Sequence, residues 1–208
     1  MIELLTANTP NGKKISIMLE EIEFNYKLTK ININKDEQFK PEFKKISPFS
    51  KTPVIIDHET KTSLFETGAI LIYLAEKSGK FYNKDRRTII NQWLFGQAAY
   101  VGPMLGQHHQ FHYYNPGKSA FGENRYFKIS ERIYRELDER LASSKFLAGD
   151  DYTIADIATF PWIARHEWHD IGLNKYKNLA KWYQEISNRK AVQKGYDLLK
   201  KGEVIPKV

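Results

Sequence analysis

The chain of 208 residues is 41% hydrophobic and 27% charged, with a formal net charge of +7, which is ordinary for a globular protein of one large or two small domains. No apolar run reaches the roughly 18–20 residues of a membrane span, and the N-terminus MIELLTANTP lacks the pattern of a secretory signal. We therefore expect a cytoplasmic protein with no membrane partner.

The sequence contains no cysteine. This excludes disulfide bonds, CxxC redox pairs, cysteine nucleophiles and thiolate metal sites. Any thiol chemistry must therefore use a thiol that a ligand brings.

The positive charge raises the question of a nucleic-acid ligand. Basic residues alternate with acidic ones, and the longest basic clusters are pairs: Lys13-Lys14, Arg86-Arg87 and Lys200-Lys201. Basic and aromatic residues do not interleave in one stripe, as single-stranded nucleic acids require. We expect a solvated basic surface, including these pairs, and no nucleic-acid partner; a small anionic ligand would also benefit from the charge.

Residues 1–80 alternate short β-rich segments with helical patterns. Strands are expected at 2–6, 26–33, 54–56 and 63–65, and helices after the turn at 10–12, around 41–46 and at 66–77. Gly79 stands where a helix C-cap belongs. The order β-α-β-α-β-β-α, with a right-handed first crossover, predicts an α/β domain over residues 1–80.

Residues 79–87 (GKFYNKDRR) are polar and are expected to form a linker. From residue 88 onward the apolar period is helical, with one long face from Ile90 to Val101 and later helices around 133–141, 179–186 and 192–199. The sequence therefore predicts an all-α domain over residues 88–208.

The segment Thr153-Ile154-Ala155-Asp156 has the spacing of a helix capping box. Asp156 could be taken for a catalytic carboxylate, but this spacing indicates a role in folding.

Two other segments have the composition of a binding site. In Lys51-Thr52-Pro53-Val54 a proline opens a strand, and a cis bond before Pro53 would expose the backbone of Thr52 to an extended peptide. Glu66 and Thr67 stand where a strand gives way to a helix. They could simply cap that helix, or Glu66 could bind a ligand ammonium while Thr67 and the helix amides hold a carboxylate.

The ordered set Lys-Thr-Pro-Val at 51–54, Glu-Thr-Gly-Ala-Ile at 66–70 and Thr-Ile-Ala-Asp at 153–156 resembles the glutathione transferases over essentially the whole chain. Matches at 9–12, 37–39, 92–95 and 102–107 make it similar to the nu-class, Ure2-like bacterial branch of that family. The resemblance implies a thioredoxin-like N-terminal domain, a helical C-terminal domain and a homodimer.

The resemblance also implies the site residues. Thr9 and Asn11, where the first strand meets the first helix, would stabilise a glutathione thiolate at the positive end of the helix dipole. Thr6 is a rival hydroxyl that belongs to the strand. The residues implied to hold the glutathione backbone are Gln38, Thr52, Pro53, Glu66 and Thr67, while Gln92 and Arg125 would reach a glutathione bound mainly by the other subunit. For Gln92, an ordinary polar helix position explains the residue equally well.

The function implied is reduction of small disulfides with glutathione or its disulfide as co-substrate, accompanied by weak peroxidase activity and weak transferase activity on electrophiles. The alternative is a non-enzymatic interaction or regulatory protein that binds glutathione on the same fold. Retention of Asn11, Thr52, Pro53, Glu66 and Thr67 favours the enzyme.

His108 and His112 are four residues apart, which suggests a metal site. The nearest following acidic residue is Glu123, and metal sites usually need three or more ligands, so no metal is expected. We expect this histidine segment to line an electrophile pocket together with Tyr113 and Tyr114.

Overall fold

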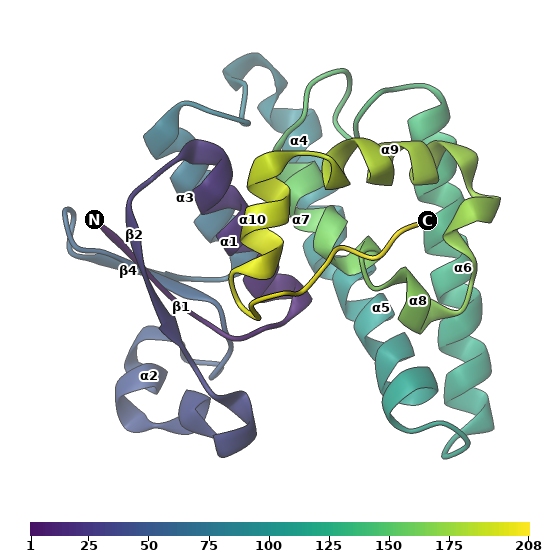
Figure 1. Ribbon diagram of the computed structural model, residues 1–208, viewed down its shortest axis with the longest axis horizontal. Helices are drawn as coiled ribbons and strands as arrows, with labels where there is room; N and C mark the ends of the chain where they lie inside the picture. The colour runs from purple at the N-terminus through teal and green to yellow at the C-terminus, as the bar shows by residue number, and fades with distance from the viewer. The chain divides into compact units, whose positions relative to one another are not determined.

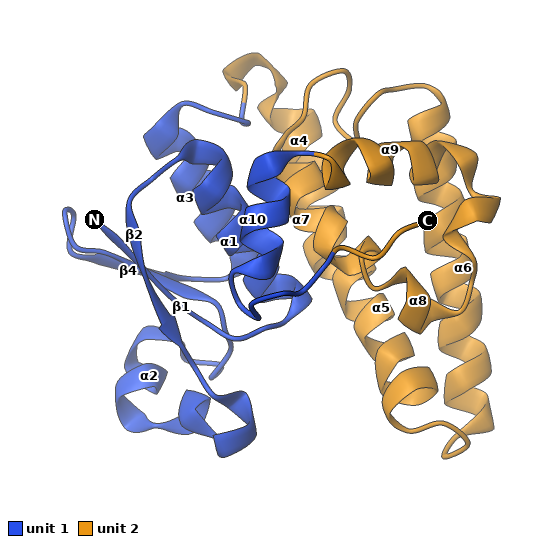
Figure 2. Ribbon diagram, in the orientation of Figure 1, with its two compact units in different colours: residues 1–82, 189–204 blue, residues 83–188, 205–208 orange.

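The computed structural model describes residues 1–208 as two compact units (Figures 1 and 2). The first comprises Met1–Tyr82 and Arg189–Val204, and the second comprises Asn83–Asn188 and Ile205–Val208. No helix is both long enough and apolar enough to cross a membrane. The domain limits 1–80 and 88–208 stay a prediction, and the C-terminal helix α10 (Lys190–Asp197) packs with the first unit.

The first unit is built on a four-stranded sheet of order β2-β1-β3-β4. Its strands are β1 (Ile2–Thr6), β2 (Tyr26–Lys30), β3 (Val54–Asp57) and β4 (Thr62–Phe65). Strands β1 and β2 are parallel, whereas β3 is antiparallel to both β1 and β4. Strand β2 ends earlier than predicted because Asn32 caps a short 3-10 turn, its side chain accepting from the amide of Asn34 at 3.1 Å.

Helices α1 (Pro10–Ile22) and α3 (Thr67–Ser78) lie with α10 on one side of this sheet, and α2 (Pro41–Ile46) lies on the other (Figure 1). The element order β-α-β-α-β-β-α is confirmed. Gly79 ends α3 in the left-handed region, with φ 68°, as its position predicted.

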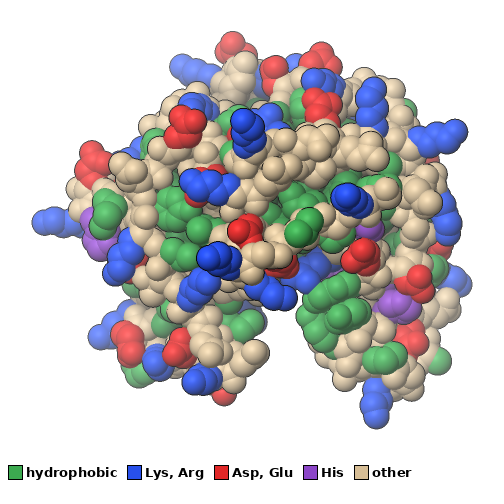
Figure 3. All heavy atoms as spheres, in the orientation of Figure 1, with side chains coloured by type: hydrophobic (Ala, Val, Ile, Leu, Met, Phe, Trp, Pro, Cys, Tyr) green, Lys and Arg blue, Asp and Glu red, His purple; other side chains and the backbone are tan.

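The basic pair Lys13-Lys14 is not on the solvated surface, so the expectation for this pair is wrong. Lys13 is 0% and Lys14 2% exposed, because α1 is covered by α10 and α3. A buried ammonium group requires polar partners, and Lys13 Nζ donates to the carbonyl of Tyr196 at 2.8 Å and pairs with Glu203 at 2.9 Å. Elsewhere on the visible face, basic and acidic side chains are interspersed (Figure 3).

The second unit is helical, as predicted. A continuous helical run passes from α4 (Arg87–Gly96) through the π-helical segment Gln97–Val101 and α5 (Gly102–His108) to a second π-helical segment, His109–Tyr114. The remaining helices are α6 (Ala120–Ala142), α7 (Ile154–Ile163), α8 (His166–His169) and α9 (Lys177–Ser187).

The capping box at the start of α7 is confirmed. Asp156 is fully buried, and its carboxylate accepts from the Thr153 amide at 3.0 Å, the Leu147 amide at 2.9 Å and the Trp182 indole at 2.9 Å. Because these donors come from three parts of the second unit, Asp156 is a folding element.

Part of the histidine segment belongs to a buried network: His108 and His109 are buried, whereas Tyr113 and Tyr114 are exposed, and the expected electrophile pocket stays a prediction. His109 Nε2 lies 2.8 Å from His169 Nε2, Tyr134 donates to or accepts from His169 Nδ1 at 2.6 Å, and His108 Nε2 lies 2.9 Å from the His169 carbonyl. The cause is α8, which brings His169 into the interior against α5 and α6. The described residues contain no group of three or more metal-ligating side chains.

We predict that this network makes the protein less stable as the pH falls. Burial lowers the pKa of His108, lowers that of His169 well below its usual value, and lowers that of His109 to about 3. Below about pH 6.5 the unfolded chain therefore binds protons that the folded chain excludes, so the free energy of unfolding decreases by on the order of 1 kcal/mol per pH unit for each histidine.

Chemical denaturation between about pH 6.5 and about pH 5, above the ordinary pKa values of carboxylates, measures this slope. His109→Asn should make the slope shallower than in the wild type. A free energy of unfolding that is flat across this range would contradict a neutral buried network.

Candidate functional site

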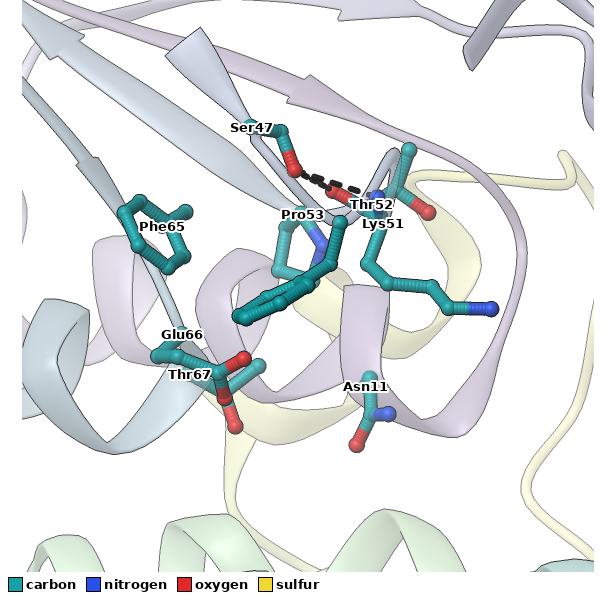
Figure 4. Close-up of a pocket in the computed structure, with 9 residues that line it drawn as sticks. Asn11, Ser47, Lys51, Thr52, Pro53, Phe65, Glu66 and Thr67 are labelled. Carbon is teal, nitrogen blue, oxygen red and sulfur yellow. Dashed lines mark hydrogen bonds between the residues drawn. The ribbon is translucent and has the colours of Figure 1, made fainter. Parts of the chain in front are cut away.

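A pocket of about 250 Å³ opens in the first unit where α1, the loop before β3 and the start of α3 meet (Figure 4). It brings together five of the predicted site residues, Asn11, Thr52, Pro53, Glu66 and Thr67, with Ser47, Phe49, Lys51 and Phe65. The predicted binding segments, far apart in sequence, therefore form one site.

One wall of the pocket is the loop that leads into β3. The Thr52-Pro53 bond is cis, and the ladder between β3 and β1 begins at Val54. The backbone of Thr52 therefore lies next to the pocket and outside that ladder. The loop is fixed by Ser47, whose Oγ donates to the Lys51 carbonyl at 2.8 Å and accepts from the Lys51 amide at 3.0 Å (Figure 4).

The opposite wall is the start of α3. Glu66 precedes the helix with φ 70° and ψ 117°, and its side chain makes no capping hydrogen bond. The Glu66 side chain is exposed at the pocket, while its carbonyl accepts from the Ile70 amide at 2.9 Å. Of the two interpretations of Glu66, the geometry favours a carboxylate available to a ligand cation over a helix cap.

Thr67 is the first residue of α3 and is only 9% exposed. Its Oγ1 accepts a hydrogen bond from Lys14 Nζ at 3.2 Å. Burial lowers the pKa of Lys14 to about 7, although the nearby carboxylate of Glu66 opposes that shift. A cationic donor thus lies directly beneath the start of α3, close to two residues that line the pocket.

The third contribution comes from the start of α1. Thr9 is the N-cap of this helix, and its Oγ1 accepts from the Gly12 amide at 3.0 Å. Asn11 lies in the first helical turn and lines the pocket, whereas Thr9 is not among the lining residues. The rival Thr6 is fully buried and its hydroxyl donates to the Ala7 carbonyl at 3.3 Å.

Besides Thr9, three predicted residues lie outside this pocket. Gln38 lies in the 3-10 turn Glu37–Phe39, where its Nε2 donates to the Ile33 carbonyl at 3.4 Å and its Oε1 is buried without a hydrogen-bond partner. Gln92 on α4 and Arg125 on α6 are exposed side chains of the second unit. The binding roles of these three residues stay predictions.

Ser47, Lys51 and Lys14 were not among the residues predicted to form the site. The serine stands four residues before Lys51 in the same loop, so its spacing could have suggested a loop-closing hydrogen bond. No local pattern distinguishes Lys14 from a surface lysine, because the helices that bury it are distant in sequence.

Two family models match the chain. Residues 2–76 match the glutathione S-transferase N-terminal domain, and residues 122–190 match the glutathione S-transferase C-terminal domain.

Several known proteins are similar to this chain over nearly its whole length. The disulfide-bond oxidoreductase YfcG of Escherichia coli is 44% identical over 96% of this chain and 95% of its own length. A glutathione transferase from Pseudomonas putida, solved with one glutathione disulfide bound per subunit, has a TM-score of 0.89 and 37% identity over 97% of this chain and 92% of that one. The transcriptional regulator URE2 of Saccharomyces cerevisiae is 31% identical over 90% of this chain and 65% of its own length.

We predict that Glu66 is kept at a cost in stability. A side chain held in a sparsely populated positive-φ conformation costs about 1–3 kcal/mol, whereas glycine tolerates it and loses about 0.5–1 kcal/mol in chain entropy. Glu66→Gly should therefore raise the free energy of unfolding by about 1 kcal/mol.

Glu66→Ala is the matched control, because it removes the same carboxylate and keeps the side-chain conflict. Denaturant titration of the wild type, Glu66→Gly and Glu66→Ala measures the free energy of unfolding of each protein. Equal destabilisation by both substitutions would show that the carboxylate is a stabilising cap.

Proposed function

The chain belongs to the glutathione S-transferase family, and on that premise we propose that it is a glutathione-dependent disulfide-bond reductase. The observation that carries the proposal is a pocket beside a helix N-terminus in a chain without cysteine. The reacting sulfur atoms then belong to the ligands, and the protein supplies binding and electrostatic stabilisation.

The chemistry balances without a protein thiol. A glutathione thiolate attacks one sulfur of the substrate disulfide, forming a mixed disulfide and releasing one substrate thiolate. A second glutathione thiolate attacks the glutathione sulfur of the mixed disulfide, forming glutathione disulfide and releasing the second substrate thiol. The substrate disulfide gains two electrons and two protons, and each glutathione thiol supplies one electron and one proton. The glutathione disulfide in the Pseudomonas putida relative supports this product at such a site.

Stabilisation of the attacking thiolate is assigned to the start of α1. The N-terminus of a helix carries a partial positive charge, which lowers the pKa of a thiol placed there. The Asn11 amide lies at this end of the 13-residue helix, and the Thr9 hydroxyl caps it while keeping a proton to donate. A thiol whose pKa is lowered by these donors ionises without a general base from the protein. The thiolate then accepts their hydrogen bonds.

The two other walls would hold the rest of glutathione. Glu66 would pair with its ammonium group, and the Thr67 hydroxyl with the first amides of α3 would bind the adjacent carboxylate. The backbone of Thr52 beside Pro53 would pair with the extended peptide. Gln38 would accept a hydrogen bond from glutathione through its side-chain Oε1, which is buried and has no hydrogen-bond partner in the protein.

A homodimer would complete this arrangement, with Gln92 and Arg125 of one subunit reaching a glutathione held by the other. Arg125 suits an anionic ligand. Phe95 and Tyr100 of the second unit are 59% and 41% exposed, and association would remove such apolar surface from water.

A second function, non-enzymatic regulation, is suggested by the similarity to URE2. The pocket retains Asn11, Thr52, Glu66 and Thr67, so glutathione binding alone does not separate the two functions. Turnover does, because a regulator would bind glutathione without reducing a disulfide.

We predict that Thr9→Ala and Asn11→Ala each lower the rate of disulfide reduction. A hydrogen bond to a charged group contributes about 1.5–3 kcal/mol, which corresponds to roughly ten- to a hundredfold in rate. A coupled assay that follows glutathione disulfide formation measures the effect.

Thr9→Ser is the matched control, since it keeps both the helix cap and the hydroxyl. Treating the apo-protein with a cysteine alkylator, then removing the reagent, should leave the rate unchanged. Folded Thr9→Ala and Asn11→Ala proteins with wild-type rates would exclude this end of α1 as the thiolate site and favour the regulatory function.

We also predict a symmetric homodimer in solution, with twice the 24.3 kDa mass of the chain. Sedimentation equilibrium at micromolar protein concentration measures the mass. Phe95→Ser should weaken association because it removes exposed apolar surface that the dimer would bury. A single 24.3 kDa species across the concentration range would contradict the prediction.

A further inference from the structure

Lys14 is an unusual residue to find beneath a binding pocket. It is 2% exposed on α1, and its ammonium nitrogen lies 3.2 Å from Thr67 Oγ1. A buried lysine that only filled space could be replaced by an apolar side chain without the cost of burying a charge. The direction of the ammonium group toward a pocket residue therefore needs an explanation.

We propose that Lys14 is a positioning residue for ligand binding: it orients the Thr67 hydroxyl as a donor and couples its own positive charge to the binding of a carboxylate beside Thr67. The inference rests on the proposed function, because the carboxylate in question is that of the γ-glutamyl residue of glutathione.

The first step follows from hydrogen-bond chemistry. A protonated lysine has three donors and no acceptor, so in this contact the Thr67 oxygen must be the acceptor. The hydroxyl proton of Thr67 is then left for another acceptor. Thr67 lines the pocket next to Glu66 and begins α3, so a ligand carboxylate there meets both this proton and the first amides of the helix.

The second step concerns the charges around Lys14. The negative charge of Glu66 raises the pKa of Lys14. Burial has the larger, opposite effect, and together they place this pKa at about 7. Several other charged side chains of the elements packed together here form ion pairs with one another. Lys13 pairs with Glu203, and the pairs linking or flanking these helices are Lys194 with Glu20, Arg189 with Glu21, and Lys77 with Asp57.

These surroundings couple protonation to binding. A ligand ammonium would engage Glu66, and the ligand carboxylate would add a new negative charge near Lys14. That charge favours protonated Lys14, so binding above about pH 7 takes up a proton. Affinity for the carboxylate should then fall as the pH rises past the pKa of Lys14 in the empty site.

Lys13 offers a matched control. It is the neighbouring residue of the same helix and equally buried, but its ammonium group points to the Tyr196 carbonyl and to Glu203. Lys13→Met removes a buried lysine from α1 and keeps the hydrogen bond between Lys14 and Thr67. Lys14→Met and Lys13→Met therefore share any general cost to the helix.

The test compares two ligands by isothermal titration calorimetry. One is S-methylglutathione, whose sulfur cannot titrate. The other is its analogue with 4-aminobutyrate in place of the γ-glutamyl residue, which keeps the amine and lacks the carboxylate. Between about pH 6 and about pH 8, Lys14 of the empty wild-type site loses its proton. Over this range the affinity for S-methylglutathione should fall about tenfold relative to the affinity for the analogue.

Lys14→Met should abolish this pH dependence, bind S-methylglutathione at least about tenfold more weakly at about pH 6, and leave the affinity for the analogue unchanged. Lys13→Met should keep the wild-type pattern. Equal losses for both ligands in Lys14→Met would overturn the proposal and leave Lys14 as a structural tie between α1 and α3.

If Lys14→Met does not fold, the wild type decides the question alone, because an affinity ratio that is flat with pH would overturn the proposal. Wild-type protein that binds neither ligand at any pH would instead overturn the proposed function, and the inference with it. The two failures are therefore distinguishable.

Discussion

Two lysines of α1 are buried in the first unit, and a buried ammonium group is tolerated only where oxygen atoms surround it. Lys13 finds the Tyr196 carbonyl and Glu203, and Lys14 finds Thr67. The first set of contacts joins α1 to the C-terminal segment, and Ser16 adds a hydrogen bond to the Gly195 carbonyl at 2.7 Å. Gly195 has no side chain, which allows this close approach: a Cβ atom there would lie 2.6 Å from the Cα of Ile17.

Because α1 is held in this way, its N-terminus is fixed at the pocket. The same helix contributes the Thr9 cap, the Asn11 side chain and, through Lys14, the support of the opposite wall at Thr67. The proposed chemistry depends on this arrangement, since a chain without cysteine can only bind and activate sulfur that belongs to a ligand. A rigid helix end presents its partial charge without reorganisation when the thiolate forms.

The parts of this structure that the sequence predicts are those with local causes. The capping box from Thr153 to Asp156 needs four consecutive residues, and the strand and helix patterns of the first unit need about a dozen each. The pocket residues Thr52, Pro53, Glu66 and Thr67 were recognised because short motifs carry them.

The features that were missed depend on partners far along the chain. Tyr196 is 183 residues from Lys13, so the basic pair on α1 has the same local pattern as a solvated pair. His169 is 60 residues from His109, and without it the histidine segment resembles a pocket lining or a metal site. Gln38, Gln92 and Arg125 were assigned by resemblance alone, and their roles depend on a bound ligand or a second subunit.

To carry out the proposed chemistry, this protein without cysteine must lower the pKa of a glutathione thiol at the start of α1. The direct measurement is the ultraviolet absorbance of the thiolate of bound glutathione as a function of pH, in which every thiolate belongs to the ligand because the chain has none. We expect the bound thiol to titrate at least about one pH unit below the usual value of about 8.5 for a free thiol. A bound thiol that titrates at the same pH as free glutathione would contradict the account.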